Sequence, residues 1–581
     1  MTVPGGDVHS STSVKHDSRS VALNPPSSEP VRAAQRVVEM LHANDVRYVF
    51  GIPGAKIDAV FDALVDGGPE LIVCRHEQNA AFMAGAVGRL TGVPGVVLVT
   101  SGPGTSNLAT GLLTANTEQD PIVAICGAVP RADRLKRTHQ SMNAVALLAS
   151  VTKFAGEVND PDDAAETVAN AFRSATVEPR GAAAVVLPAD VAAEHTTAHL
   201  TAMPPLPRMG PAPAEDIQRA AERLKGAERP VLLIGARGGT PEVCAAIHSF
   251  IEGSDLPVVE TFQAAGVISR SLEQHYHGRV GLFRNQPGDV VVGRADLVVA
   301  IGYDPVEYDP SLWNPDPTRP IIHIDSGVAD IDNHYRPAIE LRGDVAATLN
   351  ALSQHVHPLT LNADINAHNA VERNRLTRID EEARQKPDSD AGLNPAAVVL
   401  ALREYLDDDT TITCDIGSIY IYMARHFRVF RPRHLLFSNG QQTLGVALPW
   451  AMAAALVRPG TQIVSVSGDG GFLFSAQELE TATRLGLSFT HIILRDNTYD
   501  MVGFQEVLKY GRKSGVQLGD YDVENFAAAF GAHGYRVQSM SEFGTILQLA
   551  MDQRGPTIID VPVDYSHNLE LAAHLPEDPF D

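Results

Sequence analysis

One stretch of the chain, Thr461 to Val502, limits the possible folds more than any other. It contains two short apolar runs, which end in Gly468-Asp469-Gly470-Gly471 and in Arg495-Asp496-Asn497. Helix-period apolar residues lie between them from Leu479 to Leu485, and Gly486 follows, where a glycine commonly ends a helix. The stretch therefore predicts a β-α-β unit whose right-handed crossover makes the two strands parallel.

The two strand ends of this unit carry the first candidate site. Asp469 and either Asp496 or Asn497 should emerge at the same carboxyl edge, where open α/β sheets bind ligands. Glycine N–H groups beside carboxylates suit a diphosphate held through Mg²⁺. The GDGG turn alone fits a tight turn with solvated acids equally well, and the second acid favours the phosphate interpretation. We expect the intervening helix to begin at Ser475, because Glu478 completes a capping-box pattern.

Strand-like and helix-like segments alternate along the rest of the chain. This pattern predicts an α/β fold of three consecutive doubly wound parallel-sheet domains. A Pro-rich link, Met203 to Pro213, and a polar, charged linker, His357 to Asn394, separate the blocks. The predicted limits are 1–29 for a disordered tail, 30–195, 214–356 and 393–570 for the domains, and 571–581 for a C-terminal tail.

Composition excludes several classes of protein. No apolar run among the 581 residues is long enough to span a membrane, and the formal net charge of −24 argues against a nucleic-acid or anionic-membrane partner. The 21 histidines show no HExxH spacing and the four cysteines form no CxxC pair. Neither a zinc site nor a disulfide framework is indicated, and a cytoplasmic location is expected.

Glu77 is the second candidate. It stands in Arg75-His76-Glu77-Gln78, directly before the segment Asn79 to Leu90, which is apolar nearly all round and should form a buried helix. A carboxylate in a first helical turn often only complements the helix dipole. The apolar helix instead favours a carboxylate shielded from water, as general acid–base work requires. The segment Gly102 to Asn107 lacks a complete phosphate-loop pattern and is interpreted as a tight turn near a site.

Together these motifs resemble the thiamine-diphosphate enzymes of the acetolactate synthase group, most of all the catabolic, FAD-independent acetolactate synthases. The resemblance runs from about Arg32 to Tyr565. Besides the two motifs of the third block, it is carried by Gly51 to Lys56, Arg75 to Ala81, His139 to Met142, Arg279 to Phe283, Tyr303 to Tyr308 and Ser438 to Thr443.

The resemblance implies a pyrimidine-binding, a central and a diphosphate-binding domain, in that order. It implies a transferase that decarboxylates pyruvate on thiamine diphosphate and ligates the hydroxyethyl unit to a second pyruvate, giving 2-acetolactate and CO₂. The expected cofactors are thiamine diphosphate and Mg²⁺, without FAD. Because such enzymes hold the cofactor between two subunits, an obligate homo-oligomer is expected, either a dimer or a dimer of dimers.

The resemblance also implies a role for individual residues. Glu77 would hydrogen-bond the pyrimidine ring and promote its proton transfers, and Lys56 and Gln140 match active-site positions that contact pyruvate. Taken alone, Lys56 and Gln140 are more readily interpreted as ordinary surface residues. The expected cofactor contacts are Glu77, Gly417, Ser418, Gln442, Leu444, Asp469, Gly470, Gly471, Asp496 and Thr498.

The metal ligands depend on how the family motif is aligned. That motif usually ends in Asn-Asn, with the second Asn and a backbone carbonyl two residues later as ligands. Counting back from Met501-Val502 places these ligands at Asp496 and Thr498, beside Asp469. Asn497 is the alternative if residue type alone is matched.

Two departures from the family pattern bear on the reaction. Leu444 stands where the group often has Met as the wedge that bends the cofactor, and its volume is similar. Gln505 stands where FAD-containing biosynthetic enzymes carry a Trp associated with 2-ketobutyrate preference, so it is a candidate substrate contact and pyruvate is the expected acceptor. The alternatives are an FAD-containing biosynthetic synthase or pyruvate oxidase, and a catalytically silent scaffold. Glu77 beside the metal motif argues against the scaffold.

Overall fold

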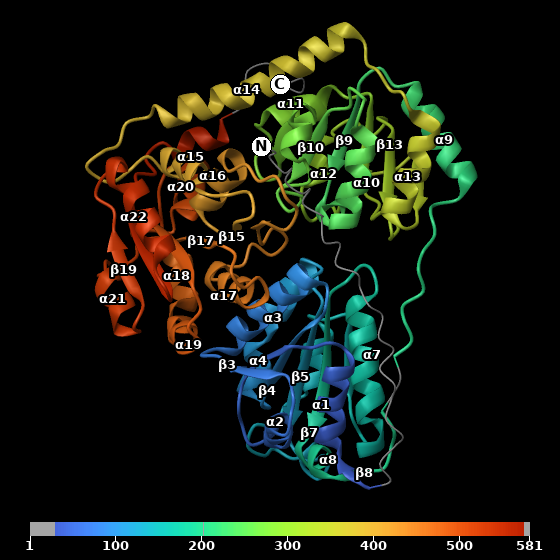
Figure 1. Ribbon diagram of the computed structural model, residues 1–581, viewed down its shortest axis with the longest axis vertical. Helices are drawn as coiled ribbons and strands as arrows, with labels where there is room; N and C mark the ends of the chain where they lie inside the picture. Colours follow the sequence, from blue (N-terminus) through green and yellow to red (C-terminus); the bar gives the residue numbers. More distant parts are fainter. Residues whose placement is uncertain (1–28, 201–202, 574–581) are drawn as a thin grey trace, which may run out of the picture.

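The computed structural model describes residues 29–200 and 203–573, which form three α/β domains in succession (Figure 1). Each domain is built on a six-stranded sheet in which every neighbouring pair of strands is parallel. The predicted fold class is confirmed. The exact domain limits stay a prediction, and most of both predicted tails lies outside the described residues.

The first domain is closed by a short antiparallel pair, β1 (Val31–Arg32) with β8 (His195–Thr196). Its sheet has the order β3-β2-β4-β5-β7-β6. The strands are β2 (Tyr48–Ile52), β3 (Glu70–Val73), β4 (Gly95–Val99), β5 (Ile122–Ala128), β6 (Phe154–Glu157) and β7 (Ala182–Pro188). The helices are α1 (Ala33–Ala43), α2 (Asp58–Val65), α3 (Glu77–Thr91), α4 (Pro103–Asn107), α5 (Ala109–Thr117), α6 (Ala144–Ala149), α7 (Ala164–Thr176) and α8 (Ala189–Ala193). As its composition predicts, α3 is buried along most of its length.

The central domain has the strand order β11-β10-β9-β12-β13-β14. Numbered within the domain, this is 3-2-1-4-5-6, the order of dinucleotide-binding folds. Its strands are β9 (Pro230–Ile234), β10 (Val258–Thr261), β11 (Tyr276–Val280), β12 (Leu297–Ile301), β13 (Ile321–Asp325) and β14 (Ile339–Arg342). Its helices are α9 (Ala214–Lys225), α10 (Pro241–Ile251), α11 (Pro287–Arg294), α12 (Pro310–Trp313) and α13 (Val345–Val356).

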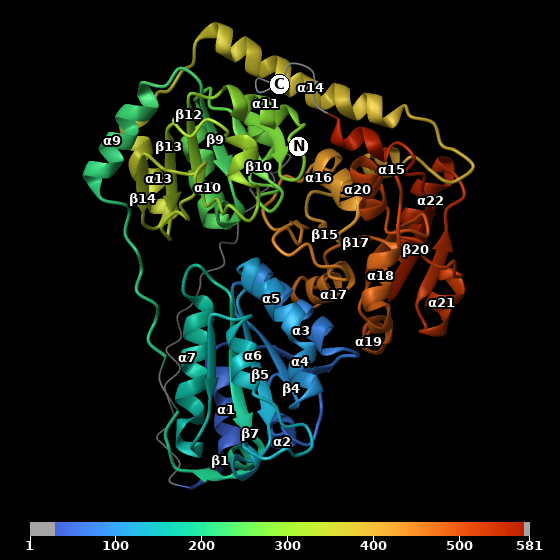
Figure 2. The same cartoon turned by 180° about the vertical axis from the view of Figure 1, so that it is seen from behind.

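The polar linker between the central and third domains is largely helical. Helix α14 (Ala363–Arg384) fills most of it and runs from one domain to the other (Figures 1 and 2). Its residues are mainly good helix formers, and only Glu372 and Arg375 are buried. A helix that is polar nearly all round is stable here because it bridges two domains rather than covering one core.

The third domain has the order β16-β15-β17-β18-β20-β19, which within the domain is 2-1-3-4-6-5, the same as in the first domain. Its strands are β15 (Thr411–Cys414), β16 (Leu435–Leu436), β17 (Ile463–Gly468), β18 (Phe489–Arg495), β19 (His533–Arg536) and β20 (Pro556–Pro562). Its helices are α15 (Pro395–Tyr405), α16 (Ser418–His426), α17 (Ala447–Val457), α18 (Asp469–Ser475), α19 (Leu479–Arg484), α20 (Asp500–Tyr510), α21 (Val523–Ala529) and α22 (Met540–Asp552). The predicted β-α-β unit is present, because β17 and β18 pair in parallel.

The predicted capping box at Ser475 is wrong. A helix already begins at Asp469, and Ser475 is its last residue, with its hydroxyl donating to the carbonyl of Gly445. The Glu478 carboxylate accepts the backbone N–H groups of Arg75 (2.9 Å) and His76 (3.1 Å) in the first domain. These two polar side chains serve contacts between distant segments, which a local sequence pattern does not reveal.

Glu478 thus helps join the first and third domains. Its contacts lie at the N-terminal end of α3, and α3 also packs against α17, as Figure 2 shows from behind. One hydrophobic core contains Phe82 and Leu112 of the first domain together with Trp450 and Phe472 of the third. The two domains that resemble each other in strand order therefore form one packed unit within the chain.

Candidate active site

The carboxyl edge of the third sheet brings Asp469 and the end of β18 together. One oxygen of the Asp469 carboxylate accepts the backbone N–H of Asn497 at 2.7 Å, and the other accepts that of Gly470 at 3.0 Å. The order of the sheet reverses between β15 and β17, so this pair lies beside the switch point where parallel sheets bind ligands. The sequence-based placement of these residues at one edge agrees with the geometry.

Asp469 and Asp496 form a pair of like charges. Burial, and then the negative charge of Asp496, raise the pKa of Asp469 to about 6. Burial likewise raises the pKa of Asp496 to about 6, and Asp500 adds to the effect. Within the described residues no group of three His, Cys, Asp or Glu side chains could hold a metal. Two carboxylates whose charges disfavour each other nevertheless fit Mg²⁺, which needs few protein ligands when a diphosphate supplies others.

The side chain of Asn497 is engaged elsewhere. Its amide oxygen accepts a hydrogen bond from the Arg495 guanidinium at 3.2 Å, and its backbone has a φ of +57°. Asp496 instead interacts only locally in this loop, where its carboxylate accepts the Thr498 backbone N–H at 3.2 Å and the Thr498 hydroxyl at 2.5 Å.

The backbone carbonyl of Thr498 points away from the neighbouring segment. Thr498 forms an isolated antiparallel bridge with Gln517. The hydrogen bonds of this bridge come from the residues on either side, since the carbonyl of Asn497 and the N–H of Tyr499 make them, each at 2.8 Å. Thr498 is therefore at a position whose carbonyl faces away from the partner strand.

Gly417 and Ser418 lie at the start of α16, next to the same edge. Gly417 has a φ of +140°, which favours glycine, and it precedes the first helical residue. The Ser418 hydroxyl donates to Asp500 at 2.8 Å and accepts the side-chain amide of Asn568 at 3.0 Å. The turns after β15 and before α20 are thereby joined.

Gln442 and Leu444 lie on the loop that leads into α17. Gln442 is exposed, with a φ of +47°, while Leu444 is half-buried against the core of the third domain. The backbone N–H of Gly445 donates to the carboxylate of Asp415 at 2.9 Å. Sequence reasoning missed Asp415, although it directly precedes Ile416-Gly417-Ser418.

Glu77 begins α3 and is 8% exposed. The side-chain amide of Asn107 donates to one of its carboxylate oxygens at 2.9 Å. The interpretation of Gly102–Asn107 as a tight turn is wrong, because Pro103–Asn107 form the short helix α4. Asn107 is the last residue of α4, so this segment does lie beside a candidate residue, as predicted. Its position in the segment was the available signal for Asn107, which the sequence analysis did not single out.

Lys56 and Gln140 lie at the carboxyl edge of the first sheet. Gln140 has a φ of +61° and lies against Gly102, where an added Cβ would come within 3.1 Å of its side chain. The half-buried Lys56 follows β2, and its backbone passes close to Gly127 in β5. Gln140 and Glu77 thus both lie beside the Gly102–Asn107 segment.

The candidate residues form two clusters. In residues 29–200 and 203–573 no hydrogen bond or ion pair joins Glu77, Lys56 or Gln140 to the Asp469–Asp496 pair. Gln505, on α20, is exposed. The candidate residues are therefore divided between two partial sites, one on the first domain and one on the third.

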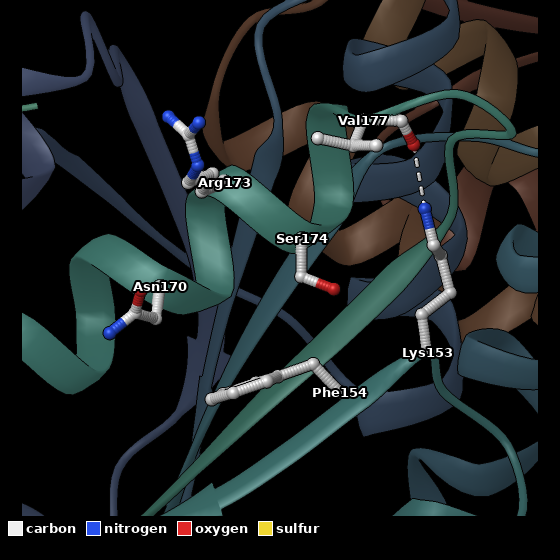
Figure 3. Close-up of a pocket in the computed structure, with 6 residues that line it drawn as sticks. All are labelled: Lys153, Phe154, Asn170, Arg173, Ser174 and Val177. Atoms are coloured by element: carbon white, nitrogen blue, oxygen red, sulfur yellow. Dashed lines mark hydrogen bonds between the residues drawn. The ribbon is translucent and has the colours of Figure 1, made fainter. Parts of the chain in front are cut away.

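A surface hollow in the first domain is separate from both clusters. It lies between α7 and β6, where Lys153 and Phe154 face Ser174 and Val177 (Figure 3). The Lys153 ammonium donates to the Val177 carbonyl at 2.7 Å, so it holds in place the turn that follows α7. None of the candidate site residues lines this hollow.

Models of thiamine pyrophosphate enzymes match all three domains. The N-terminal TPP-binding domain matches residues 31–147, the central domain 217–352, and the C-terminal TPP-binding domain 415–561. The chain is 53% identical over 545 residues to the acetolactate synthase of Bacillus subtilis (strain 168), covering 93% of this chain and 95% of that protein. It is 46% identical over 546 residues to the catabolic acetolactate synthase of Raoultella terrigena, covering 93% and 97%. The chain belongs to the acetolactate synthase family of thiamine pyrophosphate enzymes.

Proposed function

We propose that the protein is an acetolactate synthase, which decarboxylates one pyruvate and joins the remaining two-carbon unit to a second, giving 2-acetolactate and CO₂. The observation that carries this proposal is the 53% identity to a protein of that name over nearly the whole of both chains. The two partial sites on the first and third domains support it, since they contain the groups that the reaction needs.

Thiamine diphosphate, when bound, supplies the electron sink for the loss of CO₂ and the new carbon–carbon bond. In this proposal Asp469, Asp496 and the carbonyl of Thr498 hold Mg²⁺. The buried pair of like charges supports the assignment, because a cation removes their repulsion. Asp496 is favoured over Asn497, whose amide oxygen is already bonded to Arg495. The diphosphate would lie against Gly417, Ser418, Gly470 and Gly471, and Gln442 and Leu444 would contact the rest of the cofactor.

Glu77 is the residue proposed to hold and move a proton at the pyrimidine ring. Asn107 orients it by bonding one carboxylate oxygen, which leaves the other for the cofactor. Lys56 and Gln140 are proposed to bind the pyruvate carboxylate, since an ammonium and an amide N–H both donate to carboxylates. Gln505, on the exposed side of α20, is the proposed contact for the acceptor.

We propose an obligate homo-oligomer, with Glu77 of one subunit facing the Asp469–Asp496 pair of another. The separation of the two partial sites within one chain supports this arrangement. Helix α18, which begins at Asp469, also exposes Leu473 and Phe474 by 43% and 46%. Neighbouring exposed apolar side chains beside a site are typical of surfaces that a protein partner covers.

We propose that the central domain binds no FAD, although its strand order is that of a dinucleotide-binding fold. The turn after β12 packs against the turn after β9, at the edge where a dinucleotide would lie. In that turn the carboxyl group of Glu307 accepts the backbone N–H of Ala236 at 2.9 Å. A Cβ on Gly235 would come within 2.4 Å of the Tyr303 backbone, so the turn covers the glycine-rich loop directly.

Neither a nucleic-acid nor a membrane partner is proposed. Across the described ranges, no helix is long and apolar enough to cross a bilayer. All four cysteines are free and buried, which supports the proposed cytoplasmic location.

The test is an assay of the purified full-length protein with pyruvate, thiamine diphosphate and Mg²⁺, with and without FAD. We expect acetolactate to form only when Mg²⁺ and thiamine diphosphate are present, at a rate that FAD does not change. Absence of acetolactate would contradict the proposed reaction. Stoichiometric yellow flavin in the purified protein would contradict the proposed lack of FAD.

A further inference from the structure

A buried carboxylate, Asp415, stands at the centre of the proposed cofactor edge and belongs to no motif identified above. It directly follows β15 and is 1% exposed. Its oxygens accept three backbone N–H groups, from Ile416 at 2.8 Å, Gly445 at 2.9 Å and Ala447 at 3.2 Å. The carboxylate therefore joins the end of β15 to the start of α17.

Asp415 also touches the first turn of α18, against which the diphosphate is proposed to lie. A Cβ added to Gly471 would lie 2.8 Å from the carboxyl carbon of Asp415. A real Cβ does not fit at that distance, so the glycine allows the helix to pack directly on the carboxylate. Asp415 thus contacts three segments that face the proposed cofactor, namely the strand end before Gly417, the loop after Leu444, and the start of α18 at Gly470-Gly471.

The burial of this group is costly. Burial raises the pKa of Asp415 to about 6, while the backbone N–H groups act in the opposite direction. Within residues 29–200 and 203–573 no Lys, Arg or His forms an ion pair with it. A carboxylate buried without a cation is maintained here by backbone donors alone, and its removal would leave those donors unsatisfied.

The loop that Asp415 holds is fixed at its other end as well. Glu118 of the first domain accepts the backbone N–H of Gly440 at 3.0 Å, and the hydroxyls of Thr114 and Thr443 lie 2.8 Å apart. Leu444 lies between these contacts and Gly445. Its backbone position is therefore set on both sides, and its half-buried apolar side chain is proposed to contact the cofactor.

We propose that Asp415 is a positioning residue for the reaction, which fixes Leu444 relative to the start of α18. This inference rests on the proposed function. By binding Gly445 and contacting Gly471, the carboxylate sets the spacing between the loop that touches the middle of the cofactor and the helix start that holds its diphosphate. It contacts neither substrate nor reacting atoms, and acts through Leu444.

Asp415→Asn is the sharpest substitution, because the side chain keeps its shape. An amide has one acceptor oxygen, so its NH₂ group would face either the Ala447 or the Ile416 N–H, donor against donor. We expect kcat to fall by about 10- to 100-fold, as for other residues that orient a binding group. The KM for pyruvate should change by less than about threefold, because Asp415 does not touch the proposed pyruvate contacts.

A double-mutant cycle with Leu444→Ala separates positioning from general destabilisation. The full-length holoenzyme is assayed for kcat, and the affinity of the apoprotein for thiamine diphosphate with Mg²⁺ is measured by intrinsic fluorescence. If Asp415 acts through Leu444, the effect of Asp415→Asn on both quantities should be much smaller in the Leu444→Ala background. Glu307→Gln, which alters a buried central-domain carboxyl that is also held by backbone N–H groups, is the matched control and should leave cofactor affinity unchanged.

Strictly additive effects in this cycle, or wild-type kcat and cofactor affinity for Asp415→Asn, would overturn the inference. If Asp415→Asn does not fold, Gly471→Ala replaces it in the same cycle, because its methyl group meets the same carboxylate. Additive effects of Gly471→Ala and Leu444→Ala would equally overturn it. An inactive wild-type protein would contradict the proposed function instead, so the two failures are distinguishable.

Discussion

The central and third domains differ in the side chains at the carboxyl edges of their parallel sheets. Both have glycine-rich turns at the point where the strand order reverses. At the central edge, Arg237 lies between Asp325, at 2.7 Å, and Asp304, at 3.0 Å. The Glu307 carboxyl accepts backbone N–H groups and the hydroxyl of Thr261. The ion pairs and donors at this edge are satisfied by the domain itself, and Glu307, whose pKa burial raises to about 8, is neutral at pH 7.

At the edge of the third domain, the acidic groups repel one another. Asp469 and Asp496 each have a pKa raised to about 6 by burial and by a neighbouring carboxylate. Lys513 forms an ion pair with Asp500 at 3.5 Å and offsets the charge of Asp496 only in part. The comparison teaches that strand order alone does not identify a site, whereas an uncompensated group of charges at the switch point does.

The largest expected effect tests whether the carboxyl edge of the third domain holds only part of the active site. Glu77→Gln keeps the side-chain volume and the Asn107 contact but removes the proton-carrying group. We expect acetolactate formation to fall by about 10²- to 10⁴-fold, the usual contribution of general acid–base catalysis, with binding of thiamine diphosphate retained. Steady-state assays and cofactor titrations measure the two quantities. Unchanged turnover would show that the third edge does not depend on Glu77.

The second prediction tests the balanced charges of the central edge. Asp325 is fully buried, and Asp325→Asn leaves Arg237 with only the more exposed Asp304. We expect the free energy of unfolding to fall by about 3 kcal/mol, because removing one member of a buried ion pair is strongly destabilising. Thermal unfolding of the protein measures it. Asp304→Asn is the control and should cost less, since the Asp304 side chain is 23% exposed. Equal stability of all three proteins would contradict the comparison.

The sequence-based predictions are accurate where the interacting groups are close in the sequence, and they fail where the groups are far apart in it. The β17–β18 pair was predicted closely, because β-branched runs and glycine turns are local signals. Glu478 was misread as a helix cap, since its true partners, Arg75 and His76, lie about four hundred positions away.

Site residues follow the same rule. Asp469 was predicted because a motif marks it, and the structure places it beside the end of β18. Asp415 and Asn107 were not predicted, because their importance depends on which backbone or carboxylate the fold brings to them. The helical state of the polar linker was missed for a different reason, since α14 has no apolar face to give a periodic pattern.

The third prediction concerns pH and the central edge. Burial raises the pKa of Glu307 to about 8, above its ordinary value of 4.5. The folded protein therefore binds a proton more tightly than the unfolded chain, so this contribution to stability is present below about pH 4.5 and is lost as the pH rises to about 8. Glu307→Gln mimics the protonated form. It should reduce the change in the free energy of unfolding with pH by roughly 2 kcal/mol. Thermal midpoints of both proteins at pH 5 and pH 8.5 measure it, and parallel pH profiles would contradict it.

The smallest expected effect is a gain of stability rather than a loss. It distinguishes the edge of the third domain most directly from that of the central domain. Asp496→Asn removes a charge that Asp469 and Asp500 disfavour, so the metal-free protein should gain about 1 kcal/mol in free energy of unfolding at pH 7.5. Asn is the usual ligand of the family motif at this position, so the loss of the ligand is tested with Asp496→Ala, whose affinity for Mg²⁺ in the presence of thiamine diphosphate should fall at least about tenfold. Urea unfolding and Mg²⁺ titration measure the two quantities. Asn497→Gly is the matched control, because glycine accepts the φ of +57° and lacks the alternative ligand. If the control loses Mg²⁺ affinity and Asp496→Ala does not, the ligand is Asn497, and the alignment that selects Asp496 is wrong. A loss of stability in metal-free Asp496→Asn would mean that the carboxylate is compensated within the domain, as the acids of the central edge are.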